Sequence, residues 1–323
     1  MSSPPRVFVT RRLPGSALDR LAEQSDLEVW RGAGAPPPAA LHEAARRAEG
    51  LLCLLTDRID AALIEACPRL RVLSSCSVGL DHVDLEAARA RGIPVGFTPG
   101  VLVETTADLA FGLMLAAARR VVEADRFVRD GGWTWERRWD PDGFLGLDVH
   151  GATLGVIGLG AIGRAVARRA GGFGMRVLGW SRTRREVEGV EIAPLEAVLE
   201  RSDFLSVHLA LTPETRGLLN AEALARVRPG AVLVNTARGG IVDEGAIARA
   251  LHSGRLAAAA IDVFAVEPLE PGSPLLTAPN LVLTPHIGSA SVVTRSRMAD
   301  LAVDNLLAGL AGRPMPHCAD PGD

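Results

Sequence analysis

The sequence predicts an α/β protein built from parallel sheets, and three observations support this prediction. Short apolar runs rich in β-branched residues alternate with Ala-, Leu- and Arg-rich helical stretches from end to end. Such alternation is typical of parallel sheets covered by helices. Several runs, GAVLVNT at 230–236 among them, are apolar throughout, as strands buried on both faces are. The length of 323 residues predicts two domains.

The elements can be placed in order along the chain. A first series of strands is expected at 6–10, 27–30, 51–55, 71–77 and 94–98, with helices at 38–48, 60–66 and 84–91. A second series of strands is expected at 153–157, 175–180, 204–209, 231–236, 257–263 and 281–284, followed by a helix at 291–310. The Trp-, Gly- and Arg-rich segment 131–150 interrupts this rhythm. Taken alone, it predicts either a domain border or a long covering loop.

The composition excludes several classes of function. With 35 basic and 38 acidic residues, a formal charge of −3, the chain lacks the basic footprint of nucleic-acid binders and polybasic membrane anchors. All the cations are Arg and there is no Tyr, so Schiff-base lysines, P-loop lysines and phenolic acids are excluded. The 4 Cys form no C-x-x-C pair, which indicates free thiols in a reducing compartment. We therefore expect a cytoplasmic protein without nucleic-acid, membrane or metal partners.

A glycine-rich turn at 158–163 predicts a dinucleotide site. Gly158, Gly160 and Gly163 form G-x-G-x-x-G between a predicted strand and a predicted helix. The first glycine allows the tight turn, the second lets the backbone approach a pyrophosphate, and the third lets helix and strand pack closely. The phosphates would then face a helix N-terminus.

The end of the following strand bears on the choice of cofactor. An NAD enzyme carries an acid there, for the ribose hydroxyls, whereas this chain has Ser181, Arg182, Thr183 and Arg184. A hydroxyl and two guanidiniums, with no carboxylate to repel it, suit a 2′-phosphate. The sequence therefore favours NADPH over NADH, with a solvated charged turn as the alternative.

Three later strand ends each carry one chemically useful side chain. Arg238 follows the strand at 231–236, Glu267 follows that at 257–263, and His286 follows that at 281–284. Because ligands bind at the carboxyl ends of the strands in open α/β sheets, these residues are expected to converge. An Arg can bind a carboxylate and polarise a carbonyl, and a His supported by Glu can exchange a proton near neutral pH. Their combination predicts catalysis, although each residue alone has a structural alternative.

Five segments together resemble the signature blocks of a known family. They are SVGLDHVD (77–84), GLGAIG (158–163), NTARGG (235–240), DVFAVEP (262–268) and TPHIGSA (284–290). They resemble those of the D-isomer-specific 2-hydroxyacid dehydrogenases, and most closely those of the glyoxylate/hydroxypyruvate reductases. The resemblance implies a Rossmann NAD(P)-binding domain at 100–286. This domain would be inserted in a flavodoxin-like substrate domain at 1–99 plus 287–323, which makes segment 131–150 a loop inside the cofactor domain.

The resemblance also implies roles for matching positions. Arg238 would bind and polarise the 2-oxo acid, Glu267 would support the His, and His286 would donate the proton to glyoxylate or hydroxypyruvate. The remaining substrate contacts would come from Val78, Gly79, Leu80, Ser289 and Trp139, the last reaching a partner's pocket in a homodimer. The cofactor would contact the three glycines, the segment 181–184 (Ser181 to Arg184), and both Arg238 and His286. It would also contact Thr106, Ala161, Ile162, Leu209, Ala210, Thr236, Ala237, Asp262 and Gly288.

Two alternatives stay open at this point. The first keeps the fold and reaction but changes the substrate to another 2-oxo acid, of the D-lactate or phosphoglycerate type. The second is a non-enzymatic NAD(P)-sensing protein that resembles corepressors of the same fold, which can retain the Arg, Glu and His. The lack of long Pro-rich interaction tails disfavours this second alternative.

Overall fold

The computed structural model describes residues 3–183 and 186–319, which divide into two compact units. Unit 1 comprises residues up to Leu102 and from Ser289 onward, and unit 2 runs from Val103 to Gly288. These borders differ slightly from those placed at 99/100 and 286/287. Helix α5 begins only at Val103, and the backbone N–H groups of Ile287 and Gly288 are held by the Asp262 carboxylate of unit 2.

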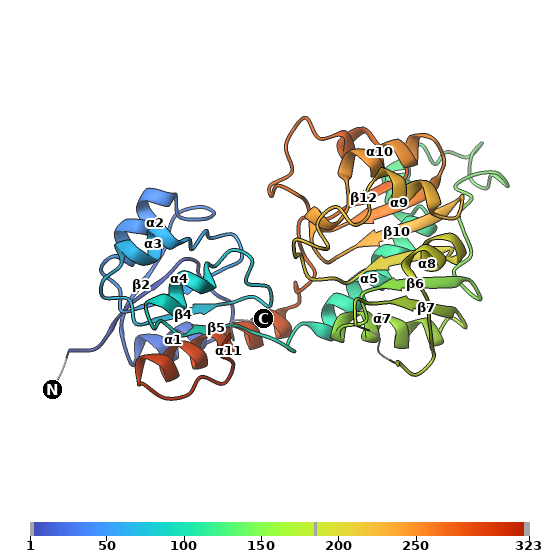
Figure 1. Ribbon diagram of the computed structural model, residues 1–323. Coiled ribbons are helices and arrows are strands. Elements are labelled where there is room, and N and C mark those ends of the chain that lie inside the picture. Colours follow the sequence, from blue (N-terminus) through green and yellow to red (C-terminus); the bar gives the residue numbers. More distant parts are fainter. Residues whose placement is uncertain (1–2, 184–185, 320–323) are drawn as a thin grey trace. The chain divides into compact units, whose positions relative to one another are not determined.

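Unit 1 is a parallel sheet with helices on both faces (Figure 1). Its strands pair in the order β2-β1-β3-β4-β5. Its elements are β1 (Arg6–Val9), α1 (Ala17–Ala22), β2 (Asp26–Val29), α2 (Pro38–Ala45), β3 (Gly50–Cys53), α3 (Ala61–Ala66), β4 (Val72–Ser75), α4 (Leu85–Ala90), β5 (Val95–Gly96) and α11 (Val292–Leu310).

Alternate strand residues of unit 1 supply two cores. Phe8, Leu51 and Leu73 pack on one face with α2, α3 and α4, whereas Val7 and Val72 pack on the other with α1 and α11. This two-sided burial explains why the strands read as continuous apolar runs. Their ends were overestimated: the runs at 71–77 and 94–98 pair only over β4 and β5, because the chain turns into loops beyond them.

Unit 2 is a second parallel sheet, with strand order β12-β11-β10-β9-β6-β7-β8 (Figure 1). Its elements are α5 (Val103–Ala118), α6 (Val121–Arg129), β6 (Thr153–Ile157), α7 (Ala161–Gly171), β7 (Arg176–Trp180), β8 (Val190–Ile192), α8 (Leu195–Arg201), β9 (Phe204–Val207), α9 (Ala221–Arg226), β10 (Ala231–Asn235), η1 (Gly239–Ile241), α10 (Glu244–His252), β11 (Leu256–Ile261), η2 (Pro274–Thr277) and β12 (Leu281–Leu283).

The strand order of unit 2 determines where a ligand can enter. Helices α5 and α7 pack on one face of the sheet, and α8, α9 and α10 pack on the other. Strand β6 is central and the chain continues from it to β7 on one side, while β9 lies on the other. The direction of winding therefore reverses between β6 and β9, and the carboxyl ends of these two strands flank the crevice where such sheets bind ligands.

The Trp-rich segment at 131–150 lies within unit 2 and contains no helix or strand. No helix in the described ranges is both long and apolar enough to cross a membrane.

Candidate active site

The turn after β6 has the geometry that a pyrophosphate needs. Gly158 has φ 106°, and a Cβ on it would lie 2.4 Å from the carbonyl oxygen of His208. A Cβ on Gly163 would lie 1.9 Å from the carbonyl oxygen of Gly158, so this helix can approach the strand only without a side chain. Gly160, by contrast, faces open space, and it caps the N-terminus of α7 without a side-chain hydrogen bond. The backbone N–H groups at this helix start are thus available to a phosphate. Ala161 and Ile162 form the first turn of α7.

The end of β7 departs from the sequence-based expectation in one respect. The Ser181 hydroxyl donates to the carbonyl of Thr183 at 2.6 Å, which fixes the turn locally. The guanidinium of Arg182 lies 3.5 Å from the carboxylate of Glu214 and 3.4 Å from the hydroxyl of Thr212. A carboxylate is therefore present after all, supplied by the loop after β9, where the sequence showed no link to β7. Arg184 lies outside the described residues.

Two buried polar atoms at the carboxyl ends of β9 and β10 have no hydrogen-bond partner in the described part of the chain: Nδ1 of His208 and Oγ1 of Thr236. Burial lowers the pKa of His208 to about 4, so its imidazole is neutral at physiological pH. Its Nε2 lies 2.7 Å from the Ser206 hydroxyl. Polar atoms left without partners beside an open glycine turn fit a site that a polar cofactor completes.

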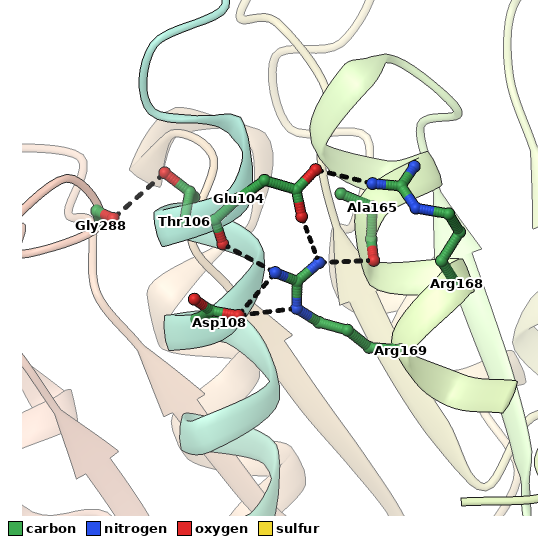
Figure 2. A network of polar contacts seen from close by, with 7 residues as sticks. All are labelled: Glu104, Thr106, Asp108, Ala165, Arg168, Arg169 and Gly288. Atoms are coloured by element: carbon green, nitrogen blue, oxygen red, sulfur yellow. Dashed lines mark hydrogen bonds and ion pairs between the residues drawn. The ribbon is translucent and has the colours of Figure 1, made fainter. Parts of the chain in front are cut away.

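The other predicted cofactor residues belong to the loops after β9 and β10 and to α5. Leu209 packs partly buried on the core of unit 2, and the carbonyl of Ala210 accepts from the Thr215 hydroxyl at 2.7 Å. The Ala237 N–H donates to Oδ1 of Asn235 at 3.0 Å. The Thr106 hydroxyl donates to the carbonyl of Gly288 at 3.1 Å (Figure 2). His208 was missed in the sequence because the strand predicted at 204–209 included it, whereas β9 ends at Val207 and places His208 at the strand end.

Asp262 organises the loop that carries His286. This fully buried carboxylate accepts from the Thr284 hydroxyl (2.6 Å) and from the N–H groups of Ile287 and Gly288 (2.9 Å each). Its backbone carbonyl accepts from the N–H of His286 at 2.8 Å. Burial raises the pKa of Asp262, while these hydrogen bonds and the nearby His286 oppose the increase.

The catalytic candidates Glu267 and His286 are in direct contact. Nδ1 of His286 lies 2.8 Å from Oε2 of Glu267, and Oε1 of Glu267 accepts from the N–H of Phe264 at 3.0 Å. Burial opposes ionisation of Glu267. The hydrogen bonds from His286 and Phe264, with the charges of His286 and Arg238, outweigh burial and lower its pKa. Glu267 is thus a carboxylate near neutral pH, and as an acceptor it takes a hydrogen bond from the N–H at Nδ1 of His286.

Arg238 is held at the end of β10 by the structure around it. Asn235 donates from its amide to the carbonyl of Arg238 at 3.0 Å, and the guanidinium of Arg238 donates to the carbonyl of Ala237 at 2.8 Å. A Cβ on the next residue, Gly239, would lie 1.9 Å from the backbone of Phe264. This close approach brings the loop of Arg238 against the loop that leads to Glu267.

The remaining predicted substrate residues are distributed over both units. Val78, Gly79, Leu80 and Ser289 belong to unit 1, where Val78 and Gly79 form an irregular turn after β4 and Leu80 is buried. The carbonyl of Ser289 accepts from the N–H of Ser291 at 2.8 Å, at the start of α11. Trp139 belongs to unit 2 and is 80% exposed.

Comparisons with known proteins agree on the family. A family model described as D-isomer specific 2-hydroxyacid dehydrogenase, NAD binding domain, matches residues 111–288. A glyoxylate reductase of Korarchaeum cryptofilum is 49% identical over 317 residues, which cover 97% of this chain and 95% of the relative. A glyoxylate reductase of Aeropyrum pernix is 49% identical over 319 residues, with the same coverage of 97% and 95%.

Solved structures give the same result. The TT0316 protein of Thermus thermophilus superposes with a TM-score of 0.92 and 51% identity, covering 98% of this chain and 100% of its own. An NADPH-dependent glyoxylate/hydroxypyruvate reductase of Sinorhizobium meliloti, in complex with NADP and malonate, has a TM-score of 0.86 and 37% identity, covering 98% and 97%. The chain belongs to the D-isomer specific 2-hydroxyacid dehydrogenase family.

Proposed function

We propose that this chain is an NADPH-dependent reductase of glyoxylate and hydroxypyruvate, which it converts to glycolate and D-glycerate. The observation that carries the proposal is the hydrogen bond between Glu267 and His286, with the charge of Arg238 acting on the same carboxylate. The names of the relatives support the choice of substrate. The glycine turn and the unpartnered atoms of His208 and Thr236 support the cofactor site.

The proton chemistry follows from the hydrogen bonds of His286. Because Glu267 accepts from Nδ1, this nitrogen keeps its proton, and Nε2 is the nitrogen that gives up a proton and takes one back. The acid needed for reduction is the imidazolium form, in which both ring nitrogens carry a proton. Bound nicotinamide would supply the hydride to the carbonyl carbon, while Nε2 of His286 protonates the carbonyl oxygen.

The substrate would be held by charge and by backbone donors. The Arg238 guanidinium would bind the 2-oxo acid and polarise its carbonyl, and the turn at Val78 and Gly79 would offer N–H groups to the carboxylate. Asp262 would keep the His286 loop in place through its backbone contacts.

NADPH is the proposed cofactor, because Ser181 and Arg182 at the end of β7 suit a 2′-phosphate. The ion pair with Glu214 would open when the phosphate takes its place, since Glu214 and Arg182 are both well exposed. We further propose a cytosolic homodimer. The four free thiols of each chain suit a reducing compartment. Its exposed Trp133, Trp135 and Trp139 supply an apolar surface for a second copy.

Product analysis tests the assigned reaction. Glyoxylate or hydroxypyruvate is incubated with one equivalent of NADPH, and the products are separated by chiral chromatography. We expect glycolate from the first and D-glycerate from the second, in amounts equal to the NADPH oxidised. L-glycerate, or NADPH loss without either product, would contradict the assignment.

A further inference from the structure

A line of hydrogen-bonding side chains lies beneath the turn at Val78 and Gly79 in unit 1. The Ser77 hydroxyl contacts the carbonyl oxygen of Gly79 at 2.8 Å and the Ser75 hydroxyl at 2.7 Å. The Ser75 hydroxyl in turn lies 3.0 Å from Nε2 of His82. Ser75 is fully buried and Ser77 is 3% exposed, so both hydroxyls depend on protein partners and not on bulk water.

The chemistry of the groups fixes the direction of every proton in this line. A carbonyl oxygen cannot donate, so the single proton of the Ser77 hydroxyl points to Gly79. Ser77 must then accept from the Ser75 hydroxyl, whose only proton is used in that bond. Ser75 in turn accepts from His82, which must carry a proton on Nε2. The line therefore runs from His82 through Ser75 and Ser77 to the Gly79 carbonyl, and cooperative polarisation strengthens such a series.

In the described part of the chain, the backbone–backbone hydrogen bonds around the turn lie at its borders. The Cys76 N–H donates to the carbonyl of Cys53 at 2.9 Å, and the Ser77 carbonyl accepts from the N–H of Thr98 at 2.8 Å. Between these contacts and Leu80, the N–H groups of Val78 and Gly79 have no acceptor among the described residues. The Thr98 contact orients the Ser77 carbonyl and, in the same peptide plane, the N–H of Val78. The Ser77 hydroxyl orients the carbonyl of Gly79 and thus the peptide plane between Gly79 and Leu80. The peptide that carries the Gly79 N–H lies between these two held planes.

We propose that Ser77, Ser75 and His82 are positioning residues that hold the Val78-Gly79 turn so that its free N–H groups bind the substrate carboxylate. This inference rests on the proposed function, and it adds three residues to those the family resemblance implied. A preformed donor pair binds an anion more tightly than a mobile one, because no ordering cost is incurred on binding.

The adjacent Ser74 provides a matched control. It lies on the same strand, is equally buried, and donates to the carbonyl of Ala302 on α11 at 2.8 Å. Successive strand residues point to opposite faces of the sheet, so the Ser74 side chain lies on the other face from that of Ser75. Ser74→Ala therefore removes a comparable hydrogen bond without affecting the turn. A general effect of losing a buried hydroxyl would therefore appear in Ser74→Ala as well.

The experiment compares Ser77→Ala, Ser75→Ala and Ser74→Ala by steady-state kinetics and thermal unfolding. We expect Ser77→Ala to raise the KM for glyoxylate about tenfold, with smaller changes in kcat. A tenfold increase corresponds to the loss of roughly one charge-assisted hydrogen bond between the turn and the substrate carboxylate. Ser75→Ala should raise that KM by about threefold, because Ser77 keeps its bond to Gly79. The KM for NADPH should not change in either. Ser74→Ala should lower Tm and leave the KM for glyoxylate as in the wild type.

Conservative variants separate hydrogen bonding from packing. Ser77→Thr retains the hydroxyl and should recover most of the wild-type KM for glyoxylate. His82→Gln retains an N–H donor, and we expect it to raise this KM less than His82→Leu does. Equal KM values in Ser77→Ala and the wild type, or equal increases in Ser77→Ala and Ser74→Ala, would overturn the proposal.

Binding of oxalate, a two-carbon carboxylate, distinguishes the failure of this proposal from failure of the proposed function. Calorimetry with NADP present should show an oxalate Kd about tenfold higher for Ser77→Ala than for the wild type and Ser74→Ala. If the protein reduces no 2-oxo acid but shows this difference in Kd, the role of Ser77 at the turn is supported and the proposed reductase activity is rejected. Turnover of glyoxylate together with equal Kd values would support the activity and reject the role of Ser77.

Discussion

At the scale of single residues, the backbone of His286 is held in the left-handed region, with φ 53°. A residue other than glycine adopts this conformation at a cost and keeps it only when its surroundings determine it. Here Asp262 does so, through its carbonyl to the His286 N–H and its carboxylate to the next two N–H groups. The outcome is an imidazole whose Nδ1 faces Glu267 and whose Nε2 is free to exchange a proton.

The substitution His286→Gln tests this assignment. A glutamine keeps a polar side chain of similar length but cannot be a cationic acid, so kcat for glyoxylate should fall by at least about 100-fold. The KM for NADPH and Tm should stay close to the wild-type values. His252→Gln on α10 is the matched control, because His252 is exposed and its Nδ1 contacts the carbonyl of Ala248 on its own helix. Equal kcat values in His286→Gln and the wild type would mean that another group supplies the proton.

The buried imidazole of His208 predicts a pH-dependent stability. Its pKa is about 4, against 6.5 for a free imidazole, so between these values the unfolded chain binds a proton that the folded chain does not. Its contribution is therefore complete above pH 6.5 and is lost as the pH falls toward 4. A difference of this size corresponds to about 3 kcal/mol.

Urea unfolding at several pH values, with wild type, His208→Gln and His150→Gln, measures this effect. The wild type and the exposed control His150→Gln should lose stability in parallel on acidification. His208→Gln should lose about 3 kcal/mol less between pH 6.5 and 4. Parallel curves for all three proteins would show that His208 does not resist protonation.

Much of this site could be predicted from strand ends, because polar residues that directly follow apolar strands meet at one edge of a parallel sheet. That argument found Arg238, Glu267 and His286 without any structure. It could not find Glu214 beside Arg182, or the line from His82 to Ser77, since these contacts depend on loop conformations. Loop conformations are set by hydrogen bonds that leave no periodic pattern in the sequence.

At the scale of elements, α5 and α7 are joined by a polar cluster on their exposed sides (Figure 2). Arg169 on α7 contacts Asp108 at 2.6 Å and Glu104 at 2.8 Å on α5, and its stem is largely covered. Arg168, the neighbouring residue, contacts Glu104 at 2.6 Å and is 63% exposed. Arg168 and Arg169 lie in the last turn of α7 and Glu104 in the first turn of α5, so the cluster joins the C-terminal end of α7 to the start of α5 at the border of unit 2.

Replacing each arginine in turn measures what this cluster contributes. Arg169→Met should lower the free energy of unfolding by about 1–2 kcal/mol, because it loses several hydrogen bonds on a partly buried stem. Arg168→Met should lower it by less than about 0.5 kcal/mol, since an exposed pair is screened by solvent. Chemical denaturation of both variants checks the difference, and equal effects would contradict the distinction drawn between them.

The sequence predicted most strands and helices of both units, but it did not predict which elements pack against each other. Strand β6 was predicted with its observed bounds, whereas β8, a three-residue strand at the sheet edge, is too short to show a pattern. The pairing of α5 with α7 could not be predicted either, because Glu104 and Arg168 are 64 positions apart.

At the scale of the whole molecule, the Trp-rich segment is the feature that a single chain does not explain. Trp133, Trp135 and Trp139 are 60%, 75% and 80% exposed, and Leu145 is 65% exposed. Exposed apolar groups of this size mark an interaction surface. In the proposed homodimer, a second copy of the chain would cover them.

Light scattering coupled to size exclusion tests this. The wild type should have twice the mass of one chain, and Trp135→Ser with Trp139→Ser should shift it toward the monomer. Val292→Ser is the control, because Val292 is 82% exposed but lies outside the segment. A wild-type monomer, or a double variant that stays dimeric at low concentration, would contradict the proposed interface.

The most direct test of the central claim is the loss of nicotinamide absorbance with glyoxylate, hydroxypyruvate and pyruvate, each with NADPH and NADH. We predict rapid turnover of glyoxylate and hydroxypyruvate with NADPH, and slower turnover of pyruvate. Turnover with NADH alone would keep the reaction but reject the phosphate site at Ser181 and Arg182. Tight cofactor binding without turnover of any 2-oxo acid would contradict the account and favour a sensor of the cofactor.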